Sequence, residues 1–305
     1  VGSEMCIRDS DWIVAIGGGS PIDAAKAMWV FYEYPEESFD NIIQPFSFPE
    51  LRQKAHFCAI SSTSGTATEV TAFSVITDYA KGIKYPLADF NITPDVAIVD
   101  PELTYTMPAK LCAHTGMDAL THCMEAYVST CASMFTDANA LHGIREIVEW
   151  LPKSYAGDHE ARQHMHEAQC IAGIAFSSGL LGIVHSMAHP LGALYDTPHG
   201  VANAIILPTV MEYNAPCTGE KYRDIAKAMG VEGTEKMSQE EYRKAAVDAV
   251  KQLSHDVGIP ANLKDIVKPE DIPFLAQSAY DDACRPGNPR DTSVEEITEL
   301  YKSLL

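Results

Sequence analysis

Three histidines lie within fifteen residues of the segment VHSMAHPLGALYDTPHG, which spans residues 184–200. His185 and His189 are four residues apart and would share one face of a helix, whereas His199 stands between a proline and a glycine. Histidines in such a setting serve as core residues, as metal ligands or as proton carriers. The segment by itself leaves all three roles open.

A second pair of potential ligands lies in the earlier segment GMDALTHCMEAY, residues 116–127. Asp118 and His122 are four residues apart, so one helical face would bring both side chains close enough to share a cation. Together with the later histidines they form a set of nitrogen and oxygen donors that suits iron(II) or zinc. Because no thiolate takes part, a catalytic site fits this set better than a structural zinc site.

The spacing of HSMAH at residues 185–189 also matches the zinc-protease motif HExxH. That motif needs a glutamate as its general base, and Ser186 stands in the glutamate's place. A metal-dependent hydrolase is therefore a minor alternative. Other histidines, among them His142, His159, His255 and the HMH at residues 164–166, are expected at solvent-facing or unpatterned positions.

Two loops have the composition of a phosphate-binding site. In GGGSPIDAAK, residues 17–26, glycines precede an expected helix whose free N–H groups attract phosphate oxygens. Ser20 is expected as the N-cap of this helix, with Asp23 as the other half of a capping box. The segment SSTSGTATEVT, residues 61–71, offers many hydroxyl donors around one glycine. The glycine spacing departs from GxGxxG, so neither loop alone identifies a nucleotide site.

The elements that must position these residues fall into two regions. Apolar segments at residues 11–16, 55–60, 72–78, 83–88 and 94–101 indicate strands, of which the second and the last are expected to be buried. We predict an α/β dinucleotide-binding domain at residues 11–107 and an all-α metal-binding domain at residues 108–305. Only one strand precedes the glycine turn, so the Rossmann-like domain is expected to be truncated. Residues 1–10 are expected to be a non-native leader.

Composition limits the partners of the chain. It has 305 residues, 46% of them hydrophobic, and 22 basic against 42 acidic side chains give a net charge of −20. This charge opposes nucleic acid and anionic membrane surfaces as partners. No apolar run is long enough to span a membrane, and the eight cysteines form no CxxC pair, so we expect a cytoplasmic protein with reduced thiols.

Taken together and in this order, the motifs resemble those of the iron-dependent (group III) alcohol dehydrogenases. The likeness runs from residue 11 to the C-terminus and includes AIGGGSPIDAAK, TSGTATEVT, GMDALTHCMEAYVS, HSMAHPLGALYDTPHGVANAIILP and DDACRPGNPR. The segments AMWVFYEYPE and KYPLADF are especially similar to the alcohol dehydrogenase part of bifunctional aldehyde-alcohol dehydrogenases and to ethanol and butanol dehydrogenases.

The resemblance implies an active site in the cleft between the two domains. Its metal ligands fall on Asp118, His122, His185 and His199, which would hold Fe2+ or Zn2+, and His189 matches a histidine beside the substrate. Its cofactor contacts fall on Gly18, Gly19, Ser20, Asp23, Ser62, Thr63, Thr66, Thr71, Val75 and Lys84. Ala67 and Thr68 depart from the more usual Gly-Ser pair. By the same resemblance, the region that distinguishes NAD(H) from NADP(H) is expected to lie outside this sequence.

We therefore expect a metal-dependent alcohol dehydrogenase that transfers a hydride between a nicotinamide cofactor and a short primary alcohol or aldehyde. His189 is the candidate proton carrier, and a role limited to orienting the substrate or the ligands is the alternative for it. A diol or lactaldehyde reductase of the same family and a non-catalytic metal-binding fragment are the other interpretations. We also expect a homo-oligomer.

Overall fold

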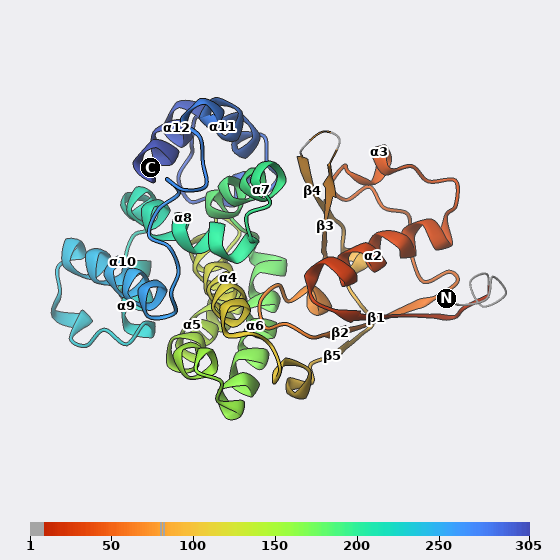
Figure 1. The fold of residues 1–305 in the computed structure, drawn as a ribbon, viewed down its shortest axis with the longest axis horizontal. Coiled ribbons are helices and arrows are strands. Elements are labelled where there is room, and N and C mark those ends of the chain that lie inside the picture. The colour runs from red at the N-terminus through yellow and green to blue at the C-terminus, as the bar shows by residue number, and fades with distance from the viewer. Residues whose placement is uncertain (1–8, 80, 82) are drawn as a thin grey trace.

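The strands occupy the first third of the chain and helices form the rest (Figure 1). The computed structural model describes residues 9–79, 81 and 83–305, so the expected leader at residues 1–10 lies almost wholly outside the described residues. β1 (Trp12–Gly17), β2 (His56–Ser61) and β5 (Val96–Ile98) form a parallel sheet in the order β1-β2-β5. β3 (Phe73–Asp78) and β4 (Ile83–Ala88) pair antiparallel, as predicted.

The first helix of the strand-containing part, α2 (Gly19–Glu33), covers one face of the parallel sheet and contributes to a compact apolar core. Trp29 is fully buried in this core, stacks on Phe57 of β2 and donates its indole N–H to Glu33 and to the carbonyl of Ala55. A short helix that the sequence did not predict, α3 (Phe39–Ile42), interrupts the connection to β2. These contacts fix the direction in which the N-terminus of α2 points.

Two local expectations in this region are wrong. Gly18, and not Ser20, is the N-cap of α2, and no side chain caps the helix there because glycine has none. The Asp23 carboxylate bonds to Thr68 and to the amide of Val75 and forms no capping box. The strand predicted at residues 94–101 is exposed rather than buried. It shares an uncovered apolar sheet face with β1, on which Trp12, Val14, Ile16, Val96 and Ile98 lie exposed, because α2 covers only the opposite face among the described residues.

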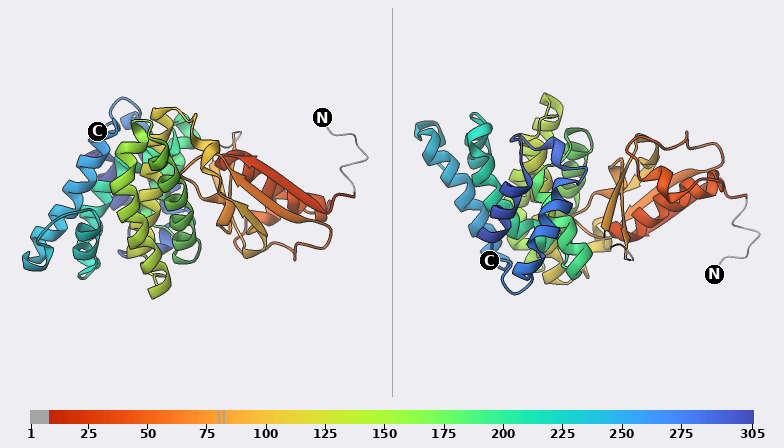
Figure 2. Two further views of the ribbon diagram at one scale, coloured as in Figure 1. Left: turned by 90° about the horizontal axis from the view of Figure 1, so that it is seen from below. Right: turned by 90° about the horizontal axis from the view of Figure 1, so that it is seen from above.

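The helical part contains nine α-helices in the described residues. They are α4 (Ala109–Val128), α5 (Met134–Tyr155), α6 (His159–Gly179), α7 (Ile183–Tyr195), α8 (His199–Asn214), α9 (Lys221–Ala228), α10 (Gln239–Asp256), α11 (Ile272–Tyr280) and α12 (Val294–Ser303). α4 is buried along most of its length and packs against α5, α6 and α8. Figure 2 shows these helices side by side, with the strands at one end. A charged or polar residue on the inner face of α4 is therefore surrounded by protein.

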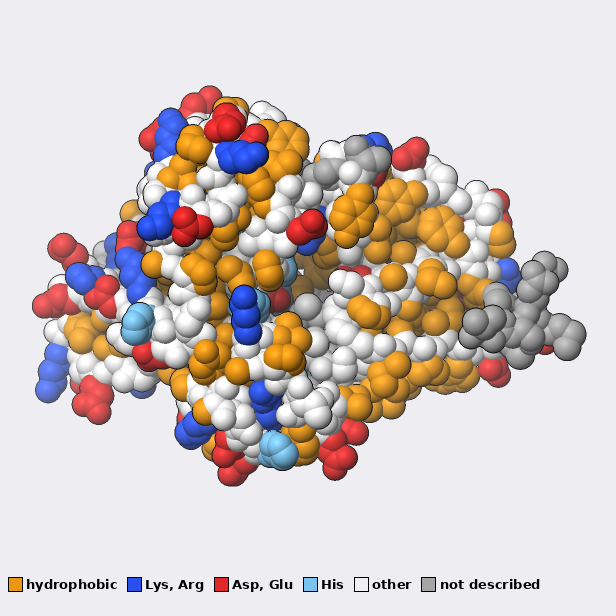
Figure 3. Space-filling model, in the orientation of Figure 1, with side chains coloured by type: hydrophobic (Ala, Val, Ile, Leu, Met, Phe, Trp, Pro, Cys, Tyr) orange, Lys and Arg blue, Asp and Glu red, His pale blue; other side chains and the backbone are white. Residues whose placement is uncertain are grey.

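The two parts meet around a hollow that is visible in the space-filling view (Figure 3). It contains a cavity of about 270 Å³, lined from one side by α2 and the β3–β4 hairpin and from the other by α4, α6, α7 and α8. No single helix in the described ranges is long and apolar enough to cross a membrane, although α6 and α7 pass that test as a pair bent by 108°. The hollow brings together residues that are far apart in the sequence.

Candidate active site

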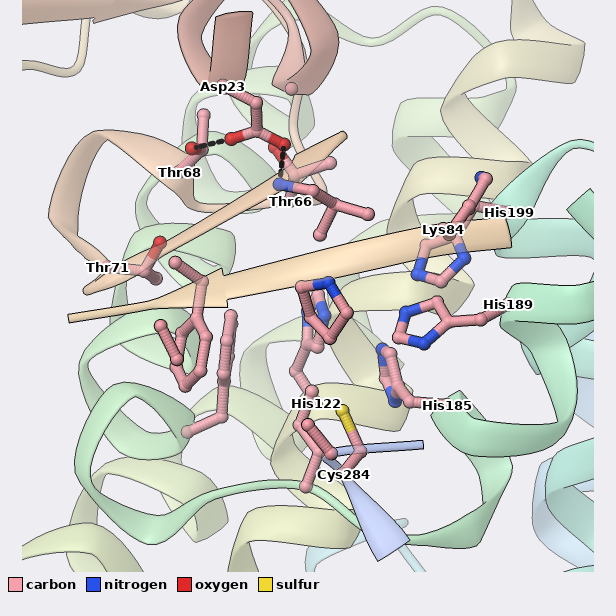
Figure 4. Close-up of a pocket in the computed structure, with 18 of the residues that line it drawn as sticks. Asp23, Thr66, Thr68, Thr71, Lys84, His122, His185, His189, His199 and Cys284 are labelled. Atoms are coloured by element: carbon pink, nitrogen blue, oxygen red, sulfur yellow. Dashed lines mark hydrogen bonds between the residues drawn. The ribbon is translucent and has the colours of Figure 1, made fainter. Parts of the chain in front are cut away.

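The four residues predicted as metal ligands meet at the helical side of the cavity. Asp118 and His122 come from successive turns of α4, His185 from α7 and His199 from the first position of α8. The Oδ1 atom of Asp118 lies 4.0 Å from the Nε2 atom of His122, 3.8 Å from that of His185 and 3.6 Å from that of His199. Figure 4 shows the three imidazoles converging from separate helices.

These distances fit a shared divalent ion. Two ligand atoms that each lie about 2.1 Å from one ion are about 3.4 Å apart in tetrahedral geometry. Asp118, His185 and His199 each offer a ligand atom, and these three atoms lie within 4.8 Å of one another. His122 lies outside that trio but approaches it through Asp118 and by stacking on His185, with ring centroids 4.7 Å apart. One carboxylate and three imidazoles are donors that iron(II) and zinc accept.

The protonation states also favour a cation. Burial alone would raise the pKa of Asp118, but the three histidines and a hydrogen bond from Asn203 hold it below its usual value, so the carboxylate is charged. Burial lowers the pKa of His122 to about 4 and the pKa of His199 well below its ordinary value. Both imidazoles are therefore neutral near pH 7, and a neutral imidazole is the form that binds a metal.

Two side chains that the sequence reasoning missed orient the ligands. Glu125 bonds to Nδ1 of His185 and accepts the backbone N–H of Val184 at 2.7 Å, which leaves Nε2 of His185 facing Asp118. Burial lowers the pKa of His185, but Glu125 together with Asp118 and Asp282 outweighs burial, so the pKa is raised. Asn203 donates to Oδ1 of Asp118 at 2.7 Å. Carboxylates behind a ligating histidine commonly fix its tautomer and its ring orientation.

His189 has a different set of contacts from the other histidines of the cavity. Its Nδ1 lies 2.8 Å from a carboxylate oxygen of Asp282, and its ring stacks on that of His199 with centroids 5.4 Å apart. Asp282 also accepts the backbone N–H of Cys284, so its position is fixed twice. The pKa of Asp282 is lowered because attraction to His189 and these hydrogen bonds outweigh the effect of burial. His189 is therefore held beside the ligand cluster with Nε2 free to face the cavity.

The predicted cofactor contacts lie mostly on the opposite side of the same cavity. Seven of the ten line it, namely Gly19, Ser20, Asp23, Thr66, Thr71, Val75 and Lys84. Figure 4 labels four of them, Asp23, Thr66, Thr71 and Lys84. Gly18, Ser62 and Thr63 do not line it. A Cβ atom on Gly19 would lie 2.9 Å from the methyl carbon of Thr66, so the glycine turn and the hydroxyl loop touch because a side chain is missing there. Because α2 begins at this turn, its N-terminus is suited to bind a diphosphate.

Charged groups behind the cofactor side of the cavity are deeply buried. Lys26 is fully buried and donates to the carbonyls of Thr71 and Phe73 at 2.7 and 2.9 Å. Burial lowers its pKa to about 8 and raises that of Asp23. Lys84 reaches into the cavity, where burial lowers its pKa, although Asp118 and other carboxylates counteract part of this effect. Lys84 thus places a cationic side chain between the two sides of the cavity.

Sequence signals for the missed residues differ in strength. Glu125 is seven residues after Asp118, so the helical face that carries the two ligands already contained it. Asn203 is four residues after His199 on α8 and lies on the face of that ligand. Asp282 is 93 residues from His189, and no spacing rule connects them. The expectation that the HMH segment faces solvent is wrong for His166, which is fully buried against Ser64.

Comparison with known proteins agrees with this geometry. The family described as "Iron-containing alcohol dehydrogenase" matches residues 4–101, and the one described as "Fe-containing alcohol dehydrogenase family, C-terminal" matches residues 112–305. The chain belongs to the iron-containing alcohol dehydrogenase family and is an oxidoreductase. The resemblance inferred from the motifs and the α/β plus all-α fold class are thereby confirmed.

Relatives within the family are named for several activities. The chain is 56% identical over 299 residues to an NADPH-dependent butanol dehydrogenase of Clostridium saccharobutylicum and 50% identical over 293 residues to a lactaldehyde reductase of Escherichia coli. Each alignment covers 96% of this chain and 76% of the relative. Among solved structures, a 1,3-propanediol oxidoreductase superposes with a TM-score of 0.91 at 39% identity, covering 97% of this chain and 77% of that one. The family therefore includes proteins named for a simple alcohol and proteins named for a diol or a hydroxyaldehyde.

Proposed function

We propose that the chain catalyses the reversible oxidation of a short primary alcohol to its aldehyde, with NAD(H) or NADP(H) as the hydride carrier and Fe2+ as the metal. One observation carries the proposal. The carboxylate of Asp118 faces three imidazoles at the base of the cavity whose opposite side presents the glycine turn and the hydroxyl loop. Substrate, metal and cofactor would thus meet in one enclosed space.

Each residue has a part that follows from its contacts. When bound, the ion supplies a Lewis acid that lowers the pKa of an alcohol hydroxyl, and the nicotinamide supplies the hydride acceptor. Asp118, the neutral His122 and His199, and His185 through its Nε2 atom would hold the ion with a net positive charge. His189, fixed by Asp282, accepts the released proton at Nε2. Lys84 places positive charge next to the cofactor side of the cavity.

The apolar end of the cavity favours an unsubstituted alkyl chain. Phe73 and Phe176 stack there with ring centroids 5.9 Å apart, and Leu180 and Leu181 complete this end. A second hydroxyl group placed among these side chains would lose its hydrogen bonds to water. We therefore place 1-butanol and ethanol ahead of diols and lactaldehyde as substrates, while the similarity to a lactaldehyde reductase makes the diol the competing candidate.

Substitution of the metal ligands tests the proposal. Asp118→Asn and His199→Ala should each lose bound iron and all turnover of 1-butanol, whereas Asp137→Asn, at a partly exposed aspartate of α5, should keep both. Retention of stoichiometric iron by both ligand variants would overturn the four-ligand assignment. The wild-type chain should quench and shift the fluorescence of added NADH or NADPH. Absence of any such binding would favour a metal-binding fragment without activity.

A substrate panel decides between the two candidate functions. With iron-loaded protein, kcat/KM should be higher for 1-butanol than for 1,2-propanediol, and the reverse order would favour the diol reductase. Turnover of esters or peptides without any nicotinamide would point to a hydrolase. That outcome is disfavoured by Ser186, which is fully buried and donates its hydroxyl to the carbonyl of Gly182. That the chain forms a homo-oligomer remains a prediction, which light scattering can test.

A further inference from the structure

One face of α6 lies directly behind the hydroxyl loop at residues 61–72. His166 bonds to the hydroxyl of Ser64, Gln169 to the loop at two points, and Ser177 accepts the backbone N–H of Ala72 at 3.1 Å. Gly173, between them, faces the loop without a side chain. These four residues recur at intervals of three or four, so they form one stripe of the helix. A stripe of the helical part thus supports a loop of the strand-containing part.

Gln169 is the centre of this stripe. Its Oε1 accepts the backbone N–H of Ala67 at 2.8 Å, and its Nε2 donates to a carboxyl oxygen of Glu69 at 2.6 Å. Gln169 and Ala67 are fully buried, and Glu69 is almost so. Because one partner is a donor and the other an acceptor, the side-chain amide of Gln169 satisfies both. The two partners belong to the same short turn of the loop, η1 (Thr68–Val70) and its N-cap.

Ala67 needs such support because its backbone is strained. Its φ and ψ of 52° and 27° lie in the left-handed region, which costs free energy for every residue with a Cβ atom. The methyl group enters the space left by Gly173, where an added Cβ would lie only 2.3 Å from that of Ala67. The left-handed residue separates Thr66 from Thr68 and Thr71, of which Thr66 and Thr71 are predicted cofactor contacts. Its conformation therefore sets the direction of the hydroxyl groups on both sides.

We propose that Gln169 is a positioning residue for the nicotinamide cofactor, acting by holding Ala67 in its left-handed conformation. This inference rests on the proposed function, since it assigns the hydroxyl loop to cofactor binding. Gln169 itself does not line the cavity. Its loss should therefore weaken the cofactor through disorder of the loop and leave the metal ligands in place.

The test is a double-mutant cycle with a built-in rescue. Gln169→Met keeps the length of the side chain but removes both hydrogen bonds, and it should weaken NADH or NADPH binding about tenfold, the effect of one buried hydrogen bond. A glycine takes up the left-handed conformation without strain and needs less support. The double variant Q169M/A67G should therefore bind the cofactor within about threefold of the wild type, and A67G alone within about twofold.

Three further readouts separate this role from a general structural one. Bound iron and kcat at saturating cofactor should change little in Q169M, while the KM for the cofactor rises. Hydrogen exchange of residues 61–72 should accelerate in Q169M and return to slow exchange in Q169M/A67G. The control Q163M removes an exposed glutamine of the same helix that bonds to the exposed Glu167, and it should change none of these quantities. Additive effects of Q169M and A67G on cofactor affinity would overturn the proposal.

The experiment remains informative if the wild-type chain binds no cofactor or if Q169M does not fold. If the wild-type chain binds no nicotinamide cofactor, the proposed function fails, yet hydrogen exchange still decides whether Gln169 orders the loop. If Q169M does not fold, Ser177→Ala removes a single bond of the same stripe and should give a smaller rise in cofactor KM with unchanged iron. Unchanged exchange of residues 61–72 in both variants would contradict the inference.

Discussion

The two sides of the cavity are held in place by different means. On the metal side, the ligands sit on α4, α7 and α8, and their supports, such as Glu125, come from the same helices or from helices packed directly against them. On the cofactor side, some predicted contacts lie on α2, β3 and β4, but Thr66 and Thr71 lie in the hydroxyl loop, which bonds to α6 about a hundred residues further along the chain. The metal side is thus built on regular helices, whereas the cofactor side includes an irregular segment that needs support.

This difference has a consequence for how each side responds to change. A ligand on a helix keeps its backbone position when its supporting carboxylate is removed, so the loss is confined to ring orientation and metal affinity. A loop with a left-handed alanine loses its conformation when its support is removed, so several cofactor contacts are affected together. Variants on the metal side should therefore change turnover and iron content, whereas variants on the cofactor side should change nicotinamide affinity.

The largest effect within a folded, metal-loaded protein is expected for His189→Ala. A positioned general acid or base contributes on the order of 10²- to 10⁴-fold, so kcat should fall by at least about 100-fold and the pH profile should flatten. Iron content and cofactor affinity should stay as in the wild type because His189 bonds to Asp282 and is outside the predicted ligand set. Steady-state kinetics from pH 6 to 10 measures this. Full turnover with an unchanged pH profile would exclude a proton-carrying role.

Glu125→Gln should produce the next largest effect. The glutamine keeps the volume of the side chain but loses the carboxylate that bonds to Nδ1 of His185, so iron affinity should fall about 10- to 100-fold. Competition with a chelator measures this affinity. Glu146→Gln is the matched control, because Glu146 bonds to His164 in the same way but on a partly exposed surface. Equal iron affinity in both variants would show that the support of the metal side is dispensable.

The sequence allowed the metal side to be predicted far better than the cofactor side. The spacing of Asp118 and His122 on one helical face is a local property of the sequence. In the structure, Oδ1 of Asp118 lies 4.0 Å from Nε2 of His122, as this spacing predicts. The same rule applied to His185 and His189 would have made His189 a ligand, and only the family resemblance separated their roles. The bond from His189 to Asp282 depends on how α7 packs near the end of α11, which no local pattern encodes.

The cofactor side shows why local rules are insufficient for loops. Ser20 and Asp23 had the composition of a capping box, but tertiary contacts with Thr68 and Val75 outweighed this preference. The α2 helix then began at the glycine turn itself. Gln169 had no visible signal, because a glutamine in the middle of a helix is unremarkable until its loop partner is known. The burial of His166 was missed for the same reason.

Phe73→Ala tests the boundary between the two sides and should have a moderate effect. Removing the ring opens the apolar end next to Phe176, so kcat/KM for 1-butanol should fall about tenfold while that for ethanol changes less than about threefold. Comparison of the two alcohols at saturating cofactor measures this. Phe135→Ala, at an exposed phenylalanine of α5, should leave both values unchanged. Equal losses for both alcohols would show that Phe73 supports the loop rather than the alkyl chain.

The smallest effect is expected in the pH dependence of stability and concerns Lys26. Burial holds its pKa at about 8 in the folded protein, below the ordinary value of 10.5. Between these values the unfolded chain binds a proton at Lys26 that the folded chain has released, so this lysine makes the free energy of unfolding rise with pH, by at most about 1.4 kcal/mol per pH unit. Below pH 8 the full cost of burying the charge is present in the folded state. In urea unfolding at pH 8, 9 and 10, the slope of the free energy against pH should therefore be more positive in the wild type than in Lys26→Met.

Lys54→Met provides the control for that slope, because Lys54 is a largely exposed lysine in the same part of the chain. It should retain the wild-type slope, whereas Lys26→Met should have a less positive slope and should also weaken the cofactor, since the carbonyls of Thr71 and Phe73 lose their donor. Iron affinity should stay unchanged in both lysine variants. A loss of iron in Lys26→Met would break the distinction between the two sides, because it would show that order in the hydroxyl loop is transmitted to the metal ligands.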